Sequence, residues 1–211
     1  MQNFLASELG YEAAYRLLTC CVVPRPIAWV VSVSPAGIVN VAPFSCFTYL
    51  APLPPMIGLS IGTRAGRPKD TAANIRATRH FTVNICGEDN LDALDASAAE
   101  FSPQESEAEI LGIVLAPGHT IPVPRIESAP IALECTLDRI VELGDAGGHQ
   151  FVMGLVQCFS IRPDVMADGT VDPLRLRPLA RLGRGRYARV GEQVEPTQRS
   201  RFTLSSGKLP D

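Results

Sequence analysis

The sequence predicts a mainly β protein, a Greek-key barrel of antiparallel strands with helices at its side. Strand-like apolar runs outnumber helical patterns, and short turns rich in glycine and proline join several of these runs into hairpins. The chain has 211 residues, of which 46% are hydrophobic, and this is enough for one sizeable core. We therefore expect a single domain over residues 1–190, followed by a polar tail over 191–211.

The first elements are a helix and a hairpin. Apolar residues recur at helical spacing over 6–18, which predicts a helix there. A proline-led apolar strand follows over 24–33, and a turn joins it to a second strand that begins at residue 38. Because proline has no N–H to donate, we expect Pro43 to end the regular pairing of this second strand.

The middle of the chain continues the same alternation. Phe44, Phe47 and Tyr49 are expected in the core, and the prolines at 52–55 mark a loop. The elements that follow are predicted, in order, as a strand at 56–61, a helix at 71–78, a strand at 81–85, and helices at 91–99 and 105–111 within an acidic, alanine-rich segment.

The second half contributes the longest strands. Residues 113–130 carry several prolines and are predicted as an extended connection. The runs 131–143 and 149–161 flank the turn 144–148 and should form an antiparallel hairpin. A proline-rich loop that can contain one short strand is expected over 163–179.

Composition excludes several classes of function. The net charge is −3 and only one short stretch is clearly basic, which disfavours nucleic-acid binding. We expect no membrane span, because no apolar run is long enough, and no secretory signal at the N-terminus. The six cysteines form no C-x-x-C pair, so we expect reduced, mostly buried thiols in a cytoplasmic protein. Adjacent Cys20 and Cys21 leave open a redox pair or a metal site.

The common catalytic motifs are missing from the sequence. The three histidines lie far apart and none belongs to H-E-x-x-H, so we expect no metal site. There is no G-x-S-x-G elbow, no phosphate-binding loop of the G-x-x-x-x-G-K-[ST] type, and no G-x-G-x-x-G after a strand. We therefore predict no catalytic side chain, and an enzyme built on this chain would depend on a cofactor.

A basic loop that runs into a helix is the clearest candidate for a ligand site. Arg64, Arg67 and Lys69 place three cations within six positions, and Asp70 or Thr71 can cap the helix that follows. The first N–H groups of a helix and its partial positive charge both favour a phosphate. The alternative is an ordinary capped surface helix with solvated cations, and an Asp70 carboxylate in the same pocket would count against a phosphate.

Several motifs occur together in a fixed order along the chain. They are R-P-I-A-W-V at 25–30, N-V-A-P-F-S-C-F at 40–47, P-P at 54–55, K-D-T-A-A-N-I at 69–75 and P-L-A-R-L-G-R-G-R-Y at 178–187. Over about residues 15–187 the chain thus resembles the flavin reductase-like family, although Arg184 stands where the family commonly has a second glycine.

The resemblance implies a split β-barrel that binds FMN near the interface of a homodimer. It implies an oxidoreductase in which NADH or NADPH reduces flavin, or in which electrons pass through bound FMN, and it allows a partner monooxygenase. Two alternatives stay open: a non-catalytic electron carrier that holds FMN or haem, and a barrel dimer with no cofactor.

The candidate cofactor residues fall into three groups. Lys69, Thr71 and Arg64 would hold the phosphate, with Asp70 and Asn74 beside them. Hydrogen bonds to the flavin ring would come from backbone around Val30 to Ser32 and Ala42 to Ser45 and from the side chains of Asn40 and Ser45. Ile27, Trp29, Pro43 and Phe44 would form an apolar wall. By resemblance, Arg181 lies close to the flavin and His149 reaches its substrate side.

Each of these residues also has a purely structural interpretation. Trp29 is a typical core aromatic, and Asn40 and Ser45 can serve local turns. Asn74 can stabilise the helix start, His149 can simply begin a strand, and Arg181 can be a surface residue. These alternatives are left open by the sequence.

Overall fold

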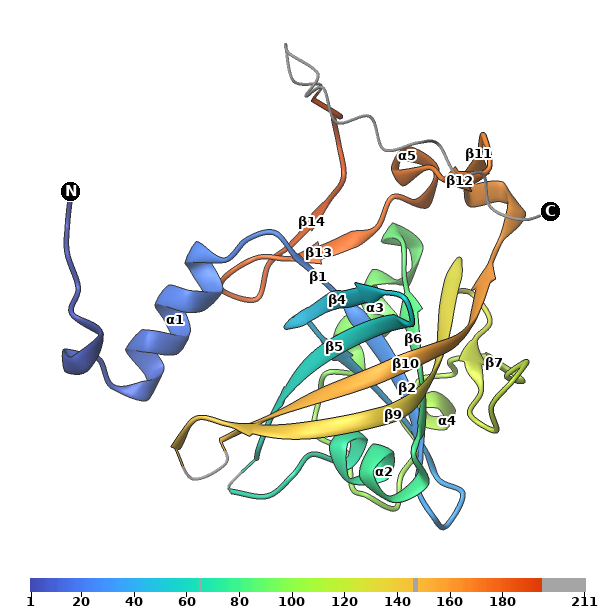
Figure 1. Ribbon diagram of the computed structural model, residues 1–211, viewed down its shortest axis with the longest axis horizontal. Coiled ribbons are helices and arrows are strands. Elements are labelled where there is room, and N and C mark those ends of the chain that lie inside the picture. Colours follow the sequence, from blue (N-terminus) through green and yellow to red (C-terminus); the bar gives the residue numbers. More distant parts are fainter. Residues whose placement is uncertain (65, 146–147, 195–211) are drawn as a thin grey trace.

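The computed structural model describes residues 1–64, 66–145 and 148–194. Ala65, the centre of the turn predicted at 144–148 and most of the predicted tail lie outside these described residues. The main feature is a seven-stranded antiparallel sheet with strand order β3-β2-β6-β9-β10-β5-β4 (Figure 1). Its strands are β2 (Ala28–Val33), β3 (Val39–Phe44), β4 (Phe47–Pro52), β5 (Pro55–Gly62), β6 (His80–Ile85), β9 (Ile131–Leu143) and β10 (His149–Ile161).

Helices and short strands surround this sheet. The helices are η1 (Ala6–Glu8), α1 (Tyr11–Cys21), α2 (Asp70–Thr78), η2 (Glu88–Asn90), α3 (Leu91–Ala96), α4 (Glu107–Ile110), η4 (Pro163–Val165) and α5 (Pro173–Leu176). The short strands are β1 (Arg25–Pro26), β13 (Leu179–Arg181) and β14 (Tyr187–Arg189), which form one small sheet, and the pairs β7 (Leu115–Ala116) with β8 (Arg125–Ile126) and β11 (Met166–Ala167) with β12 (Thr170–Val171). The predicted fold class, mainly β with flanking helices, is confirmed.

Strand β2 lies between two apolar clusters, which explains why all its residues except Ser32 are apolar. Ala28 and Val30 point into the cluster enclosed by the curled sheet, together with Phe81. The alternate residues Trp29 and Val31 point outward into a second cluster, which α3, α4 and the 113–129 connection cover. Because both faces of β2 are buried, its sequence reads as a continuous apolar run instead of alternating.

Pro43 does not end the pairing of β3, contrary to the sequence prediction. The ladder with β2 continues through Pro43, opposite Trp29, to Phe44, opposite Ala28. The N–H of Val41, two residues earlier on β3, points away from β2 and donates to the Glu107 carboxylate at 2.9 Å. Pro43 has the same orientation on this edge strand, so its missing N–H removes no bond from the ladder.

Four other predictions need correction. Residues 6–18 are not one helix, because Gly10 is extended and separates η1 from α1, which runs on to Cys21. Tyr49 is 79% exposed on the outer strand β4. The helix predicted at 91–99 ends at Ala96, where the Ser97 hydroxyl donates to the Leu94 carbonyl. Most cysteines are not buried: only Cys86 and Cys135 are, whereas Cys20, Cys21 and Cys46 are exposed.

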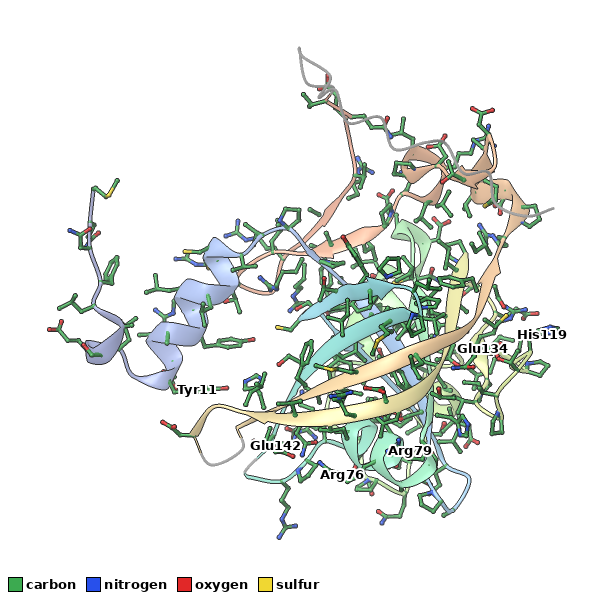
Figure 2. All side chains as sticks on the ribbon, viewed as in Figure 1. Tyr11, Arg76, Arg79, His119, Glu134 and Glu142 are labelled. Carbon is green, nitrogen blue, oxygen red and sulfur yellow. The ribbon has the colours of Figure 1, made fainter. Side chains whose placement is uncertain are left out.

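A buried carboxylate ties the 113–130 connection to the sheet. Glu134 on β9 has no exposed surface, and Figure 2 shows it beside His119 of this connection. Its oxygens accept hydrogen bonds from the N–H groups of His119 and Thr120, both at 2.6 Å, and of Ile121, at 3.2 Å. The Thr120 hydroxyl adds a bond of 2.7 Å. The extended segment, whose Ile121, Val123 and Ile126 belong to the outer cluster, is thereby fixed to β9.

Candidate functional site

A small polar hollow of about 100 Å³ lies where the 64–69 loop meets α2. Its cationic side consists of Arg64 and Lys69, and Asp70 and Thr71 supply the first turn of α2. The opposite side comes from β3 and from residues 97–101 and 107, which belong to the acidic segment. The sequence thus brings its basic loop and a distant acidic segment together around one space.

Lys69 carries a charge that the surrounding protein compensates only weakly. The side chain is half-buried and its Nζ atom lies 5.7 Å from the centroid of the Phe44 ring. Burial lowers the pKa of Lys69, the charge of Arg64 lowers it further, and Glu100 has the opposite effect. Glu100 itself forms an ion pair with Arg64 at 2.9 Å. An anion in the hollow would therefore stabilise the charged form of Lys69.

The start of α2 offers backbone donors to the same hollow. Lys69 is the N-cap residue, so the prediction that Asp70 or Thr71 caps the helix is wrong. Among the described residues, no side chain accepts a cap hydrogen bond at this helix start. The first N–H groups of α2 therefore keep the capacity to bind an anion, which the helix dipole favours.

The Thr71 hydroxyl belongs to a buried hydrogen-bond network beneath the hollow. It donates to Asn40 Oδ1 at 2.7 Å, and the Ser32 hydroxyl donates to the same oxygen at 3.3 Å. Asn74 Nδ2 donates to Ser32 Oγ at 3.3 Å. Asn40 Nδ2 donates in turn to Glu107 Oε1 at 2.5 Å. These contacts place Ser32 and Asn74 behind the hollow, where they support Asn40.

A second hollow of about 290 Å³ lies between α1, β3, α3 and the segment that follows β13. Its apolar lining includes Ile27, Leu94 and Leu182, and its polar lining includes Ser45 and Arg25. The Arg25 guanidinium donates to the carbonyls of Thr19 and Val22 at 2.6 and 2.8 Å and to Ser45 Oγ at 3.4 Å. Arg25 thus fixes the C-terminal end of α1 against β3.

Arg181 is held at the rim of this second hollow by two neighbours. Its guanidinium lies 4.4 Å from the centroid of the Tyr187 ring and 3.7 Å from Asp95 Oδ1. The Tyr187 hydroxyl donates to the same Asp95 oxygen at 2.6 Å. Burial, and then this hydrogen bond, raise the pKa of Tyr187 to about 12, so the phenol stays protonated near neutral pH.

The two hollows adjoin, because both are lined by Pro43 of β3 and by Ala98 after α3. One end of the joined space is cationic and rich in backbone donors. The other end is larger and has apolar walls with hydroxyl and guanidinium groups at its edge. Such a space fits a ligand with an anionic group at one end and a broad, partly polar ring system at the other.

The structure brings many of the predicted site residues together and leaves others outside. Residues that line one or both hollows are Asn40, Ala42, Pro43, Phe44, Ser45, Arg64, Lys69, Asp70, Thr71, Ile27 and Arg181. Trp29, Val30 and Ser32 have no exposed surface, and the Trp29 indole donates to Ser97 Oγ at 2.9 Å. Among the described residues, His149 lines neither hollow; its ring lies 3.3 Å from Ser60 Oγ at the start of β10.

Sequence reasoning did not identify several lining residues. Ser97, Ala98, Phe101 and Glu107 come from a segment that the sequence marks only as acidic and helical. Their place at the site depends on contacts with β3 across about sixty residues of chain, and no local pattern signals such contacts. Glu107 is 5% exposed and faces Asn40, although nothing in the sequence distinguishes it from its neighbours Glu105 and Glu109.

Neither a metal-binding cluster nor a membrane-spanning helix is found among the described residues. No group of three or more histidine, cysteine, aspartate or glutamate side chains is arranged to hold a metal ion there. None of the described helices combines the length and the apolar character that a membrane crossing requires.

Comparison with known proteins assigns the family. The model of the flavin reductase like domain matches residues 20–182. An uncharacterized protein of Halalkalibacterium halodurans is 39% identical over 189 residues, which cover 88% of this chain and 90% of that protein. Crystal structures of nitrilotriacetate monooxygenase component B from Bacillus cereus and of 2-nitrobenzoate 2-nitroreductase from Pseudomonas fluorescens are similar, with TM-scores of 0.90 and 0.83 and identities of 34% and 33%. The match to the first structure covers 93% of this chain and 98% of that structure. The match to the second covers 98% of this chain and 100% of that structure. The chain belongs to the flavin reductase-like domain family, whose members are flavin-related oxidoreductases.

Proposed function

We propose that this protein binds FMN in the joined hollows and passes hydride from NADH or NADPH to the flavin. The observation that carries the proposal is the pairing of a cationic, donor-rich hollow at the start of α2 with a larger hollow beside it. FMN has this composition, a phosphate joined through a ribityl chain to a flat ring with polar edges. The family assignment supports the same cofactor.

The residues present fit this cofactor at both ends. Lys69, Arg64 and the first amides of α2 would hold the phosphate, which would also satisfy the weakly compensated charge of Lys69. Ile27 and Pro43 offer apolar contact to the ring, and Ser45 and Arg181 offer polar groups at its edge. Trp29 and Val30 have no exposed surface, so we propose that they support the site from beneath.

In this arrangement the cofactor and the protein would have different roles. Bound FMN supplies the hydride-accepting ring, and the protein supplies orientation and exclusion of water. Arg25 and Gly183 hold the end of α1 in place: a Cβ at Gly183 would lie 3.2 Å from Cys20 Cα and 3.3 Å from the Thr19 carbonyl oxygen. We propose that this end of α1 limits access of solvent to the larger hollow.

A similar solved structure points to the kind of protein that would accept electrons from the reduced flavin. That structure is a component of nitrilotriacetate monooxygenase, and it shares 34% of its residues with this chain. We propose that a partner monooxygenase uses the reduced flavin, and that the protein acts in the cytoplasm, where its free cysteines stay reduced.

An absorbance spectrum followed by anaerobic mixing tests the proposal. The purified protein with added FMN should show a bound-flavin band that NADH or NADPH bleaches on a catalytic timescale. A flavin band that neither nicotinamide bleaches would contradict the reductase and favour an electron carrier. A protein that leaves the spectrum and fluorescence of added FMN unchanged would contradict both.

We also propose that two copies associate through an apolar groove lined by residues of β4, β5, β9 and β10. This groove has a volume of about 660 Å³, and its lining is almost entirely apolar. It includes Phe47, Tyr49, Met56 and Phe159, of which Tyr49 is 79% and Phe159 is 53% exposed. Monomeric proteins seldom expose apolar patches of this kind.

A charge placed in this groove should separate the two copies. Phe159→Glu would bury a carboxylate against apolar residues, so light scattering after gel filtration should give a monomer mass. Val114→Glu is the matched control, because Val114 is 61% exposed outside the groove. A dimer mass for both variants would show that copies do not meet at this face.

A further inference from the structure

A buried carboxylate beneath the smaller hollow has no part in the function proposed above. We propose that Glu107 and Asn40 form a proton-linked switch that decides whether the Thr71 hydroxyl can donate to an anion in the hollow. The inference rests on the proposed function, because the anion is taken to be the phosphate of FMN. It assigns to this site a regulation by pH.

The switch consists of four consecutive hydrogen-bonding groups. Val41 N–H donates to Glu107 Oε2 at 2.9 Å, and Asn40 Nδ2 donates to Glu107 Oε1 at 2.5 Å. Asn40 Oδ1 then accepts from the Thr71 hydroxyl at 2.7 Å. When Glu107 is ionised, its carboxylate accepts hydrogen bonds from Val41 N–H and Asn40 Nδ2. The single hydroxyl hydrogen of Thr71 is then engaged with Asn40 Oδ1 and cannot donate into the hollow. Asn40, Thr71 and Glu107 all line the hollow.

Protonation of Glu107 exchanges the donors and acceptors in this series of hydrogen bonds without moving a heavy atom far. A carboxylic acid has an O–H to donate, so it requires Asn40 to present its oxygen, and the amide rotates by half a turn. Asn40 Nδ2 then donates to the Thr71 oxygen, and Val41 N–H still donates to the second oxygen of Glu107. Each bond from Val41 to Thr71 is replaced by another, and two hydroxyl hydrogens lose Asn40 Oδ1 as their acceptor. That of Ser32 lies behind the hollow, and that of Thr71 can now donate into it.

Burial and the charge of Asp70 favour such a proton uptake. Burial raises the pKa of Glu107 and the charge of Asp70 raises it further, whereas the bonds from Val41 and Asn40 lower it, and the net direction is upward. Lys69 and Arg64 face the hollow from the loop before α2, and Glu100 is paired with Arg64. A phosphate beside these groups adds negative charge near Glu107, so binding should be accompanied by protonation.

Glu107→Gln should hold the switch in its donating state. The glutamine Nε2 can donate to a rotated Asn40, and its Oε1 can accept from Val41 N–H, as in protonated Glu107. Glu109→Gln removes the same charge from an exposed position of α4 and is the matched control. Thr71→Val combined with Glu107→Gln removes the hydroxyl that the switch is proposed to release.

Titration of each protein with FMN between pH 6 and 9, monitored by flavin fluorescence, tests the switch. For the native chain and for Glu109→Gln, the Kd should rise with pH by up to about tenfold per unit, the limit for one linked proton. For Glu107→Gln the Kd should follow only the titrations of the phosphate and of Lys69, and at pH 8 it should be about tenfold lower than that of the native chain. The double variant should lose this gain.

The outcomes separate the switch from the cofactor assignment. If FMN binds but the native chain and Glu107→Gln show the same pH dependence, the switch is wrong and the cofactor site stands. The switch is equally wrong if Glu107→Gln binds FMN more weakly while its thermal unfolding is unchanged. If no variant binds FMN, the proposed function and the switch are both overturned.

Discussion

Lys69→Met should weaken FMN binding by about 10- to 100-fold, because a charge-assisted hydrogen bond in a partly buried site contributes about 1.5–3 kcal/mol. Burial and the charge of Arg64 both disfavour the charged form of Lys69, which stands at the N-cap of α2. Methionine keeps the length of the side chain and its contact with the Phe44 ring, so the fold should be preserved. Titration of the apoprotein with FMN measures the effect.

Arg67→Met is the control for this variant. Arg67 belongs to the same loop and carries the same charge, but it is exposed and does not line the hollow. Its removal should change the Kd by less than about threefold, through general electrostatics alone. Equal losses in both variants would mean that the loop attracts FMN only by its net charge and that Lys69 has no direct contact with the phosphate.

Glu134→Ala should lower the free energy of unfolding by about 3–5 kcal/mol, because it removes hydrogen bonds to a charged acceptor that contribute about 1.5–3 kcal/mol each. The substitution leaves the N–H groups of His119, Thr120 and Ile121 without their acceptor and frees the 113–130 connection from β9 (Figure 2). Urea unfolding followed by circular dichroism measures the loss. Glu127→Ala, an exposed carboxylate of the same connection, should change the stability by less than about 0.5 kcal/mol.

The contribution of Glu134 also depends on pH in a defined direction. Burial alone would raise the pKa of Glu134, but the hydrogen bonds from His119, Thr120 and Ile121 outweigh it and hold the pKa below the ordinary value of 4.5. A carboxylate with a depressed pKa stabilises the fold above the unfolded-state pKa and loses this effect as pH falls through the folded-state pKa. The deficit of Glu134→Ala should thus be constant above about pH 5 and shrink below pH 4.5. A deficit that stays the same at pH 3 would show that the loss comes from packing.

The strands were predictable because their signals are local. The runs at 131–143 and 149–161 form β9 and β10 with the predicted bounds, and the strand at 56–61 lies within β5. The predictions that were wrong concern residues whose environment is set by tertiary contacts. Pro43 stays in β3 because an edge strand tolerates its missing N–H, and Tyr49 is exposed because β4 has no neighbour on its outer side.

Only the part of the candidate site that is formed by the sequence motifs was predictable. The basic loop and β3 meet as the sequence indicated, and Lys69, Thr71 and Asn40 share one hollow. The other part comes from residues 97–107, which reach β3 only through tertiary contacts. Helix capping was assigned wrongly for a related reason: the Thr71 hydroxyl bonds to Asn40, and its burial there removes it from the helix end.

A crystal structure of the protein grown with FMN would show directly where the phosphate binds. We expect density for the phosphate in the hollow at the start of α2, within hydrogen-bonding distance of Lys69 Nζ and the first amides of the helix. The flavin ring should then extend past Pro43 into the larger hollow bounded by Ile27 and Arg181. Flavin density elsewhere, with no phosphate at α2, would contradict the proposed FMN site.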